Sequence, residues 1–530
     1  MNPSRCLPLV LVASLALGCV TLTPPLTPPE RGGAAWLELT SKHFVLETDL
    51  EAAEADSTLS QFEGIYGAIE DVAFPTEAES RTPIRIVLFG REKDYLPFGP
   101  KETAGYFTPQ LPNDLDGVPT MVLWGGLVAA TRATFQHELT HLFVRRSLGW
   151  APRWLNEGLA QYYETFELRD GAAVLGLPLP SVGITTGSQW RSKRIGVWDR
   201  LYVPIGALPP VTALIHADYE EFMAAGGKER PTLDEQRQQT SYYLAAWGFV
   251  HMLYSVPEYK ELFNGVVEDM AHGTKLEAAW AARFGAVNPE QLEGDFRKHL
   301  LRTEGIEAQA WTTKYEPRPR AAPEQVRTLS AAEVHVLWAR LLPWTPQRLP
   351  AARAQMDAAR ALDAASPEIA YWSGLFRRAE GDAAGAEADL ARALAPRPND
   401  ARYLVAMATL YRGLERPPQD RLDDVMHRLA KVAVAPRALD LVASYDGAVG
   451  QVDDGLRFAA RATKADPTCY RCYSTGAKLL FAKGRAEEAV EAAERAVNLL
   501  PDGVRAPQLV ADLRAYRAAR DKSMREKNAR

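Results

Sequence analysis

The sequence predicts an α+β domain followed by an all-α domain of repeated helical hairpins. Alternation of apolar and polar residues with a period of two, which is typical of strands, occurs within residues 34–125. Helical spacing of apolar residues dominates 131–163 and the chain from about residue 211 onward. After residue 328 the chain is rich in Ala and Arg, and small residues recur with a period of about 34 residues, which is typical of stacked helical repeats.

Length and composition limit the classes of protein to which this chain can belong. Its 530 residues are enough for about three domains. Hydrophobic residues make up 47% of the chain, which is ample for packed cores. The formal net charge of −6 gives no reason to expect nucleic acid as the main partner. No internal apolar run is long enough to cross a bilayer as a helix.

The N-terminus has the pattern of an export signal over residues 1–18. Arg5 supplies a positive charge, and Leu7–Leu17 is an apolar stretch too short to span a membrane. The step Gly18-Cys19 resembles a bacterial lipobox, which implies that Cys19 is the lipidated first residue of the mature protein. An ordinary signal cleaved nearby is the alternative. We therefore expect an exported protein of the bacterial cell envelope, anchored by a lipid in the periplasm or at the outer membrane.

Residues 19–33 are rich in Pro, Thr and Gly, which predicts an extended tether.

The chain after residue 33 predicts a small sheet combined with one long helix. Apolar residues recur at helical spacing over Leu50–Phe74, and alternating residues predict strands at three places: His43–Thr48, Pro83–Phe89 and Thr120–Trp124.

A pair of histidines follows the last of these strands. His137 and His141 lie four residues apart within 131–148, which has the apolar spacing of a helix, so both imidazoles face one side. Glu138 lies beside them, where its carboxylate can reach a water molecule on the same ion. Two nitrogen ligands beside a carboxylate base are what a zinc peptidase needs.

A second helix is predicted over residues 153–163, with Pro152 at its start. Two helices joined by a short turn pack antiparallel, so Glu157 can face the histidine pair as a third metal ligand. Glu164, further along the same helix, is a rival for that place.

The letters HELTH followed by WLNEGLAQYYE resemble the peptidase MA-like family of gluzincin metallopeptidases. The resemblance implies a zincin-like domain over residues 34–304 that hydrolyses peptide bonds of a peptide or protein substrate. It implies one zinc ion bound by His137, His141 and Glu157. It also implies that Glu138 is the general base.

The same resemblance implies two further features. In zincins an edge strand beside the metal pairs with the substrate backbone, and Ala104–Phe107 or Met121–Trp124 would be that strand here; ordinary sheet is the alternative. These enzymes also need a donor for the developing oxyanion, for which the resemblance indicates Tyr243. A core tyrosine is the alternative. We expect His251, further along that helix, to be structural.

Three alternatives to an active peptidase stay open. The histidines could be core residues with satisfied hydrogen bonds, in which case Glu138 and Glu157 would be ordinary charges on the helices. The metal site could be structural or inactive, and the protein would then be an envelope scaffold whose repeats bind a partner. A hydrolase for a different amide, such as one in cell-wall material, could use the same residues.

The segments around the helical half lack clear periodicity. Residues 166–210 are rich in Gly, Pro and Ser, which predicts an irregular lid or specificity loop. Residues 305–328 contain Pro317, Pro319 and Pro323 among charges, which predicts a linker between domains.

The repeats occupy residues 329–513. Small residues recur at matching positions before Pro398, Pro467 and Pro501. This resembles the tetratricopeptide pattern, which implies stacked helical hairpins with a groove for a peptide or protein partner. A rigid spacer without a ligand is the alternative. The charged residues 514–530 predict a capping helix that frays into a disordered tail.

Two cysteines lie outside the export signal, as the pair Cys469 and Cys472. Asp466-Pro467 predicts the start of a helix, so Cys469 is expected in its first turn. An oxidising compartment after export allows a local disulfide between the two. A pair of small buried residues on a helix is the alternative.

Overall fold

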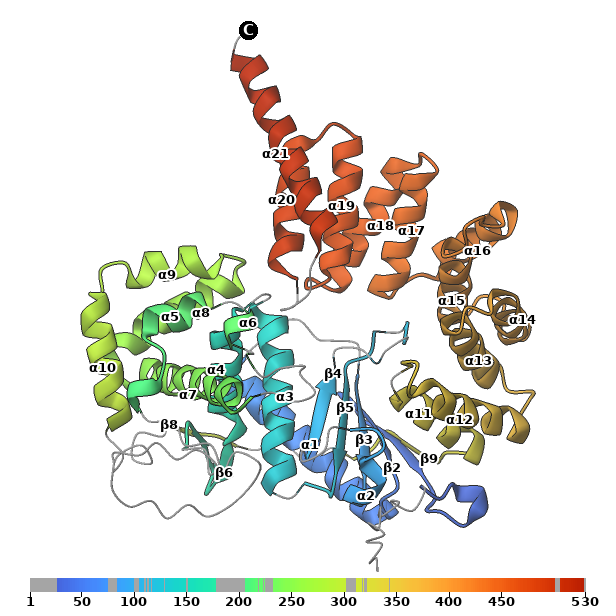
Figure 1. Ribbon diagram of the computed structural model, residues 1–530, viewed down its shortest axis with the longest axis horizontal. Helices are drawn as coiled ribbons and strands as arrows, with labels where there is room; N and C mark the ends of the chain where they lie inside the picture. Colours follow the sequence, from blue (N-terminus) through green and yellow to red (C-terminus); the bar gives the residue numbers. More distant parts are fainter. Residues whose placement is uncertain are drawn as a thin grey trace, which may run out of the picture.

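The computed structural model describes residues 26–528 with gaps (Figure 1). The gaps are 75–82, 100–103, 109–110, 112–113, 116, 128, 149–150, 178–204, 218, 223, 225–231, 302–310, 317, 319–321, 343 and 501–505. The predicted signal and Cys19 lie outside the described residues, as does most of the predicted lid. Among the described helices, none combines the length and the apolar character that a bilayer span requires.

A six-stranded mixed sheet lies at the centre of the N-terminal half. Its strands are β1 (Leu37–Thr40), β2 (Phe44–Thr48), β3 (Ile84–Phe89), β4 (Gly105–Thr108), β5 (Thr120–Trp124) and β9 (Gln325–Thr328). The strand order is β4-β5-β3-β2-β1-β9. The inner strands β2, β3 and β5 are parallel, whereas β4 and β1 run antiparallel to their neighbours. The strands β4 and β9 are therefore the two edges.

Both faces of this sheet are covered by helices. Successive residues of β3 point to opposite sides of the sheet, so their neighbours show what covers each face. Ile86 and Leu88 belong to the apolar core that includes residues of helices α1 (Ala52–Ala73) and α3 (Ala129–Leu148). Val87 and Phe89 belong to a second core, shared with α11 (Ala331–Leu341) and the helices that follow it. The first helix of the repeats thus covers the face of the sheet opposite α3.

The helical half packs beside α3. Helix α4 (Arg153–Glu164) contacts both α3 and α7 (Leu233–Ser255). The other elements before the repeats are η1 (Pro29–Arg31), α2 (Glu92–Tyr95), η3 (Ile205–Ala207), α5 (Val211–His216), α6 (Tyr219–Phe222), α8 (Pro257–Ala271), α9 (Leu276–Phe284), α10 (Pro289–Leu301) and a small sheet of β6 (Glu167–Arg169), β7 (Ala172–Leu175) and β8 (Trp311–Lys314).

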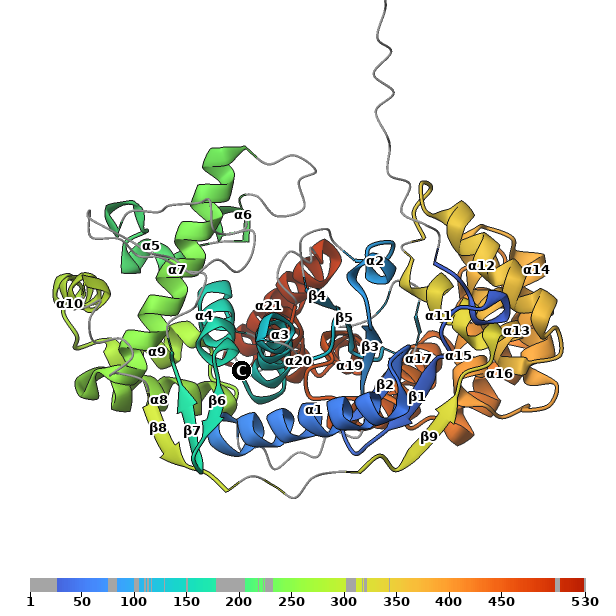
Figure 2. The same cartoon turned by 90° about the horizontal axis from the view of Figure 1, so that it is seen from below.

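Helical hairpins make up the C-terminal half, as the repeat period predicts. They comprise α11 with α12 (Leu349–Leu362), α13 (Pro367–Ala379) with α14 (Ala383–Leu394), α15 (Ala401–Arg412) with α16 (Gln419–Val432), α17 (Pro436–Ala448) with α18 (Val452–Ala465), and α19 (Tyr470–Ala482) with α20 (Ala486–Asn498), followed by α21 (Pro507–Asn528). The two views show this solenoid curving away from the sheet and returning toward α3 (Figures 1 and 2).

The far end of the solenoid touches the N-terminal half again. Burial lowers the pKa of Arg146, which lies at the end of α3. The carboxylate of Asp466, in the α18–α19 turn, lies close enough to oppose this shift by raising the pKa. A Cβ added to Gly273 would lie 3.3 Å from a guanidinium nitrogen of Arg495 on α20. The last hairpins of the solenoid therefore lie beside the N-terminal half.

The structure corrects the prediction of a linker at 305–328. This segment contains β8, which joins the small sheet, and β9, which pairs with β1 in the main sheet. Prolines and charges are frequent between these two strands, which explains why the segment resembles a linker. The repeats share a core with the sheet, so the two halves are not tethered bodies.

The predicted tether and tail also differ from the structure. Glu30, within the predicted tether 19–33, lies 3.1 Å from the His335 ring on α11, so this part of the tether is bound to the fold. The charged tail is helical as far as Asn528, and its Tyr516 is buried against α20. Apolar residues spaced along α21 secure it despite its many charges.

Because α11 covers the sheet, we expect a chain that ends at residue 328 to be unable to fold. Removal of the repeats would expose Trp36, Val87, Phe89 and Val122, which are at most 2% exposed. Each such side chain contributes about 1.5–3 kcal/mol when buried, and a whole domain is stable by only about 5–15 kcal/mol.

Soluble expression and thermal unfolding of the shortened chain check this. A chain that ends at residue 500, which keeps α11–α20, is the control and should stay soluble. A cooperative unfolding transition in the 328-residue chain would contradict the shared core.

Candidate metal centre

Helix α3 presents the histidine pair because its other side is buried. Phe135, Leu139 and Phe143 are at most 1% exposed and pack into the core under the sheet. Residues three and four positions apart share a helix face, so this apolar stripe leaves His137 and His141 on the side that meets α4. Their rings are 4.8 Å apart between centroids.

Helix α4 reaches this side through an unusually close approach to α7. A Cβ on Gly158 would lie 2.6 Å from a methyl carbon of Val250 and 2.7 Å from the carbonyl oxygen of Ala246. Only glycine fits at such a distance. The neighbouring residue, Glu157, is buried and points toward the histidines of α3.

Three ligand atoms converge at this point. One carboxylate oxygen of Glu157 (Oε2) lies 3.5 Å from Nε2 of His137 and 3.7 Å from Nε2 of His141. Within the described residues, His137, His141 and Glu157 are the group whose donor atoms lie near enough to hold a metal, all within 4.8 Å of one another. The structure thus brings together the three residues predicted as ligands.

The second nitrogen of each imidazole is held from behind. Nδ1 of His137 is 2.9 Å from the Glu164 carboxylate, and Nδ1 of His141 is 3.0 Å from the side-chain oxygen of Asn156. These oxygens can accept a hydrogen bond from Nδ1–H, so in the neutral imidazole the lone pair is on Nε2, where a metal can bind it. Glu164 therefore supports a ligand instead of replacing Glu157 as one, and outer contacts of this kind strengthen metal binding.

Arg153 completes the surroundings of Glu157. Its guanidinium donates to the other carboxylate oxygen, Oε1, over 2.8 Å. Burial alone would raise the pKa of Glu157, but His141, His137 and Arg153 lower it to about 2. Glu157 is therefore ionised at neutral pH, and its Oε2 faces both histidines.

The same charges act on His137. Burial disfavours its protonated form, but the hydrogen bonds of Glu157 and Glu164 outweigh burial and raise the pKa of His137 well above its usual value. A metal must displace that proton to bind, so we expect metal affinity to fall as the pH falls.

Tyr243 of α7 lies at the same point. Burial raises the pKa of Tyr243 well above its usual value, and the nearby carboxylates of Glu157 and Glu138 raise it further. The phenol therefore keeps its proton and hydrogen-bonds to Glu157. Glu138 is partly exposed on the same side of α3.

The sheet edge nearest this site is β4, which packs against α3. Of the two predicted edge segments, Ala104–Phe107 contributes to β4, whereas Met121–Trp124 lies in β5 and is paired on both sides. The second of these alternatives is therefore wrong, because β5 has no free edge.

His251 is buried in the helical half, away from the ligand group. Its ring nitrogens lie 2.8 Å from His299 and 3.0 Å from the carbonyl oxygen of Gly176. This agrees with the structural role that the sequence predicts. Burial lowers the pKa of His251 to about 4, so the ring is neutral at physiological pH.

Sequence reasoning missed Arg153 and Asn156. Both have a signal in the sequence, since Arg153 lies four residues before Glu157, which is the spacing of a helical ion pair. Asn156 directly precedes Glu157, but its partner, His141, is on another helix, so only the packing of α4 on α3 reveals the contact.

Comparison with known proteins gives a limited result. No protein-family model matches the chain, and no curated protein does. Among solved structures, similar chains include the MamA protein at 20% identity, over 30% of this chain and 86% of that one, with a TM-score of 0.25. YrrB, described as a tetratricopeptide-repeat protein with an unusual peptide-binding site, has 21% identity over 35% and 92% of the two chains, with a TM-score of 0.28.

A third similar structure is the repeat protein TTC0263 of Thermus thermophilus, with 18% identity over 36% of this chain and 96% of that one, and a TM-score of 0.27. These scores are too low to carry an argument. The repeat assignment rests on the hairpins of this chain itself, and the metal centre on its own geometry.

The positions of Glu157 and Glu164 predict different effects of their removal on metal content. We expect Glu157→Ala to abolish stoichiometric zinc binding, because it deletes a ligand. Glu164→Ala should retain zinc with affinity weakened by about 10–100-fold, because it deletes only an outer contact. Metal content and competition with a chelator measure both. Equal loss in the two variants would contradict the assignment of Glu157 as the ligand.

Proposed function

We propose that the protein is a zinc-dependent peptidase that hydrolyses peptide bonds. The observation that carries the proposal is the convergence of two Nε2 atoms and one carboxylate oxygen, 3.5 and 3.7 Å apart, with each Nδ1 held from behind. A pair of core histidines has no reason to share a buried carboxylate and also to be oriented by separate outer partners.

The donor set suits zinc. Two neutral imidazoles and one carboxylate are a ligand set found in catalytic zinc sites, which keep a fourth position open. Zinc bound there would make a water molecule acidic at neutral pH and would polarise a carbonyl group. His137, His141 and Glu157 would hold the ion, and Arg153 keeps Glu157 ionised and fixed.

The other residues of the site have separate roles in hydrolysis. Glu138 accepts the proton of the attacking water and passes it to the leaving amine. Tyr243 stays protonated, so its hydroxyl can donate to the carbonyl oxygen as negative charge develops on it. The free edge of β4 would pair with the substrate backbone by strand addition.

A second candidate function is that of an envelope scaffold. The series of hairpins from α11 to α20 favours it, because stacked hairpins commonly bind proteins. In that case the metal site would be structural, with four protein ligands. Exchangeable water at bound zinc separates the two candidates, since a closed structural site has none.

With either function, we propose export and a lipid anchor at Cys19, which mass spectrometry of the membrane fraction would test.

Replacement of the proposed base should separate metal binding from catalysis. We expect Glu138→Gln to bind zinc like the parent and to lose at least about 100-fold in turnover, because general-base catalysis contributes about 10²–10⁴-fold. Hydrolysis of a casein digest, followed by mass spectrometry, measures it. Full activity in the zinc-loaded variant would contradict the role of Glu138.

The proposed oxyanion donor has a milder substitution available. Tyr243→Phe removes one hydroxyl and leaves the ring packed against Phe222, so the fold should be kept. Loss of one such donor typically costs about 10²–10³-fold in turnover. Tyr242→Phe, the neighbouring residue that also packs on Phe222, is the control. An unchanged turnover number in Tyr243→Phe would exclude the role.

A further inference from the structure

The odd-numbered helices of the solenoid form its inner layer. Helices α11, α13, α15, α17 and α19 contact one another in succession, whereas the described even-numbered helices form no comparable series. The layer with the closer helices is the shorter one, so it lies on the inside of the curve. Side chains that project from this layer therefore face the groove of the solenoid.

Four arginines lie on successive helices of this layer, and three of them lie near one carboxylate. They are Arg378 on α13, Arg412 on α15, Arg437 on α17 and Arg471 on α19. Three of them, Arg471, Arg437 and Arg412, lie close enough to Asp440 of α17 to favour its ionised form, although burial raises the pKa of Asp440. Arg471 and Arg378 in turn act on Arg437, whose pKa burial lowers.

Three of these arginines lie near Asp440, but none is in salt-bridge contact with it. Among the described residues, none of the four forms an ion pair, and the hydrogen bonds of Arg412 and Arg471 go to the neutral hydroxyls of Ser444 and Tyr470. Nε of Arg437 is buried without a hydrogen-bond partner. Elsewhere on the same helices, Arg377 and Arg402 are paired with acids. Arg378 and Arg437 are half-buried, whereas Arg412 and Arg471 are exposed. A half-buried guanidinium without an anion is costly, and four cations around a single nearby carboxylate leave an excess of positive charge, so this arrangement favours an anionic ligand.

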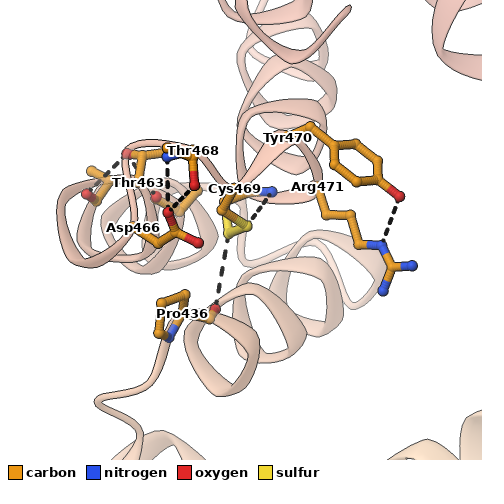
Figure 3. Close-up of a disulfide and its surroundings, with 10 residues drawn as sticks. Pro436, Thr463, Asp466, Thr468, Cys469, Tyr470 and Arg471 are labelled. Atoms are coloured by element: carbon orange, nitrogen blue, oxygen red, sulfur yellow. Dashed lines mark hydrogen bonds between the residues drawn. A yellow bond between two sulfur atoms is a disulfide. The ribbon is translucent and has the colours of Figure 1, made fainter. Parts of the chain in front are cut away.

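The disulfide fixes part of this cluster (Figure 3). Cys469 and Cys472 close the first turn of α19, and Cys469, predicted within that turn, is its N-cap. Sγ of Cys472 lies 4.0 Å from the carbonyl oxygen of Pro436, at the start of α17. Arg471 and Arg437 directly neighbour Cys472 and Pro436 in sequence. The disulfide therefore fixes the turn of α19 that carries Arg471, and this turn packs beside the start of α17 that carries Arg437.

We propose that these four arginines form a binding site for an acidic segment of a partner protein in the groove of the solenoid. The charges are spread over four successive odd helices, which matches an extended chain with several carboxylates better than a single small anion. Asp440 in their midst disfavours a phosphate backbone, which carries a charge at every unit, but tolerates a peptide with spaced acids. The site does not depend on the peptidase activity.

The test measures peptide binding to the Glu138→Gln protein, so that hydrolysis cannot interfere. The probe is a fluorescein-labelled glutamate-rich peptide, followed by anisotropy. Its comparator carries Gln in place of every Glu, and a single-stranded oligonucleotide of equal charge tests the nucleic-acid alternative. We expect the acidic peptide alone to bind, with an affinity that falls as salt rises.

The double variant Arg437→Gln, Arg471→Gln should weaken binding at least about tenfold, because charge-assisted hydrogen bonds are lost. The matched control is Arg360→Gln, Arg457→Gln, which removes two arginines of the even helices α12 and α18 that pair with Asp357 and Asp454. It should bind like the parent. Arg412→Gln, at an exposed position, provides a second variant that leaves the core untouched.

Three results would overturn the proposal. They are no binding of the acidic peptide by the parent, equal losses in the two double variants, and tighter binding of the oligonucleotide than of the peptide. Failure of the peptidase would show in hydrolysis by the parent and would leave this binding unchanged, so the two proposals are judged separately.

Discussion

The metal centre depends on the close packing of α4 between α3 and α7. Gly158 allows it, since any side chain there would collide with Val250 and the backbone of Ala246. With α4 seated at this distance, Glu157 is forced into a buried position, where its charge needs cations. The histidines and Arg153 place positive charge beside the carboxylate, and a bound metal ion would add more.

A second constraint joins the N-terminal half to the repeats. Because β3 and β5 are buried on both faces, the sheet needs a cover on the side opposite α3, and α11 provides it. Buried Arg340 of α11 strengthens this contact, since it donates to Asp114 over 2.9 Å and lies over the ring of Trp372. The solenoid is therefore part of the fold that positions the metal centre.

The sequence predicted those features that local spacing determines. The three strands at 43–48, 83–89 and 120–124, the long helix at 50–74 and the hairpin repeats are all present, because period and composition specify them. The residues of the proposed metal site followed from a helical spacing and one adjacent helix. The strands β8 and β9 were missed, because short pairings between distant segments leave no periodic pattern. The outer contacts of Glu164 and Asn156 also depend on which helices meet.

The solenoid begins on the sheet and ends beside the N-terminal half, which relates the two proposed sites. Its first helix covers the sheet, and its far end reaches Arg146 and Gly273 of the N-terminal half. A partner held by the inner arginines would therefore stay at a fixed relation to the metal centre, instead of moving on a flexible linker. Such tethering raises the effective concentration of neighbouring segments only where the chain between them can span the distance. A substrate would then be selected by two properties: an acidic segment that binds the inner arginines, and a second segment that can extend to the proposed metal centre.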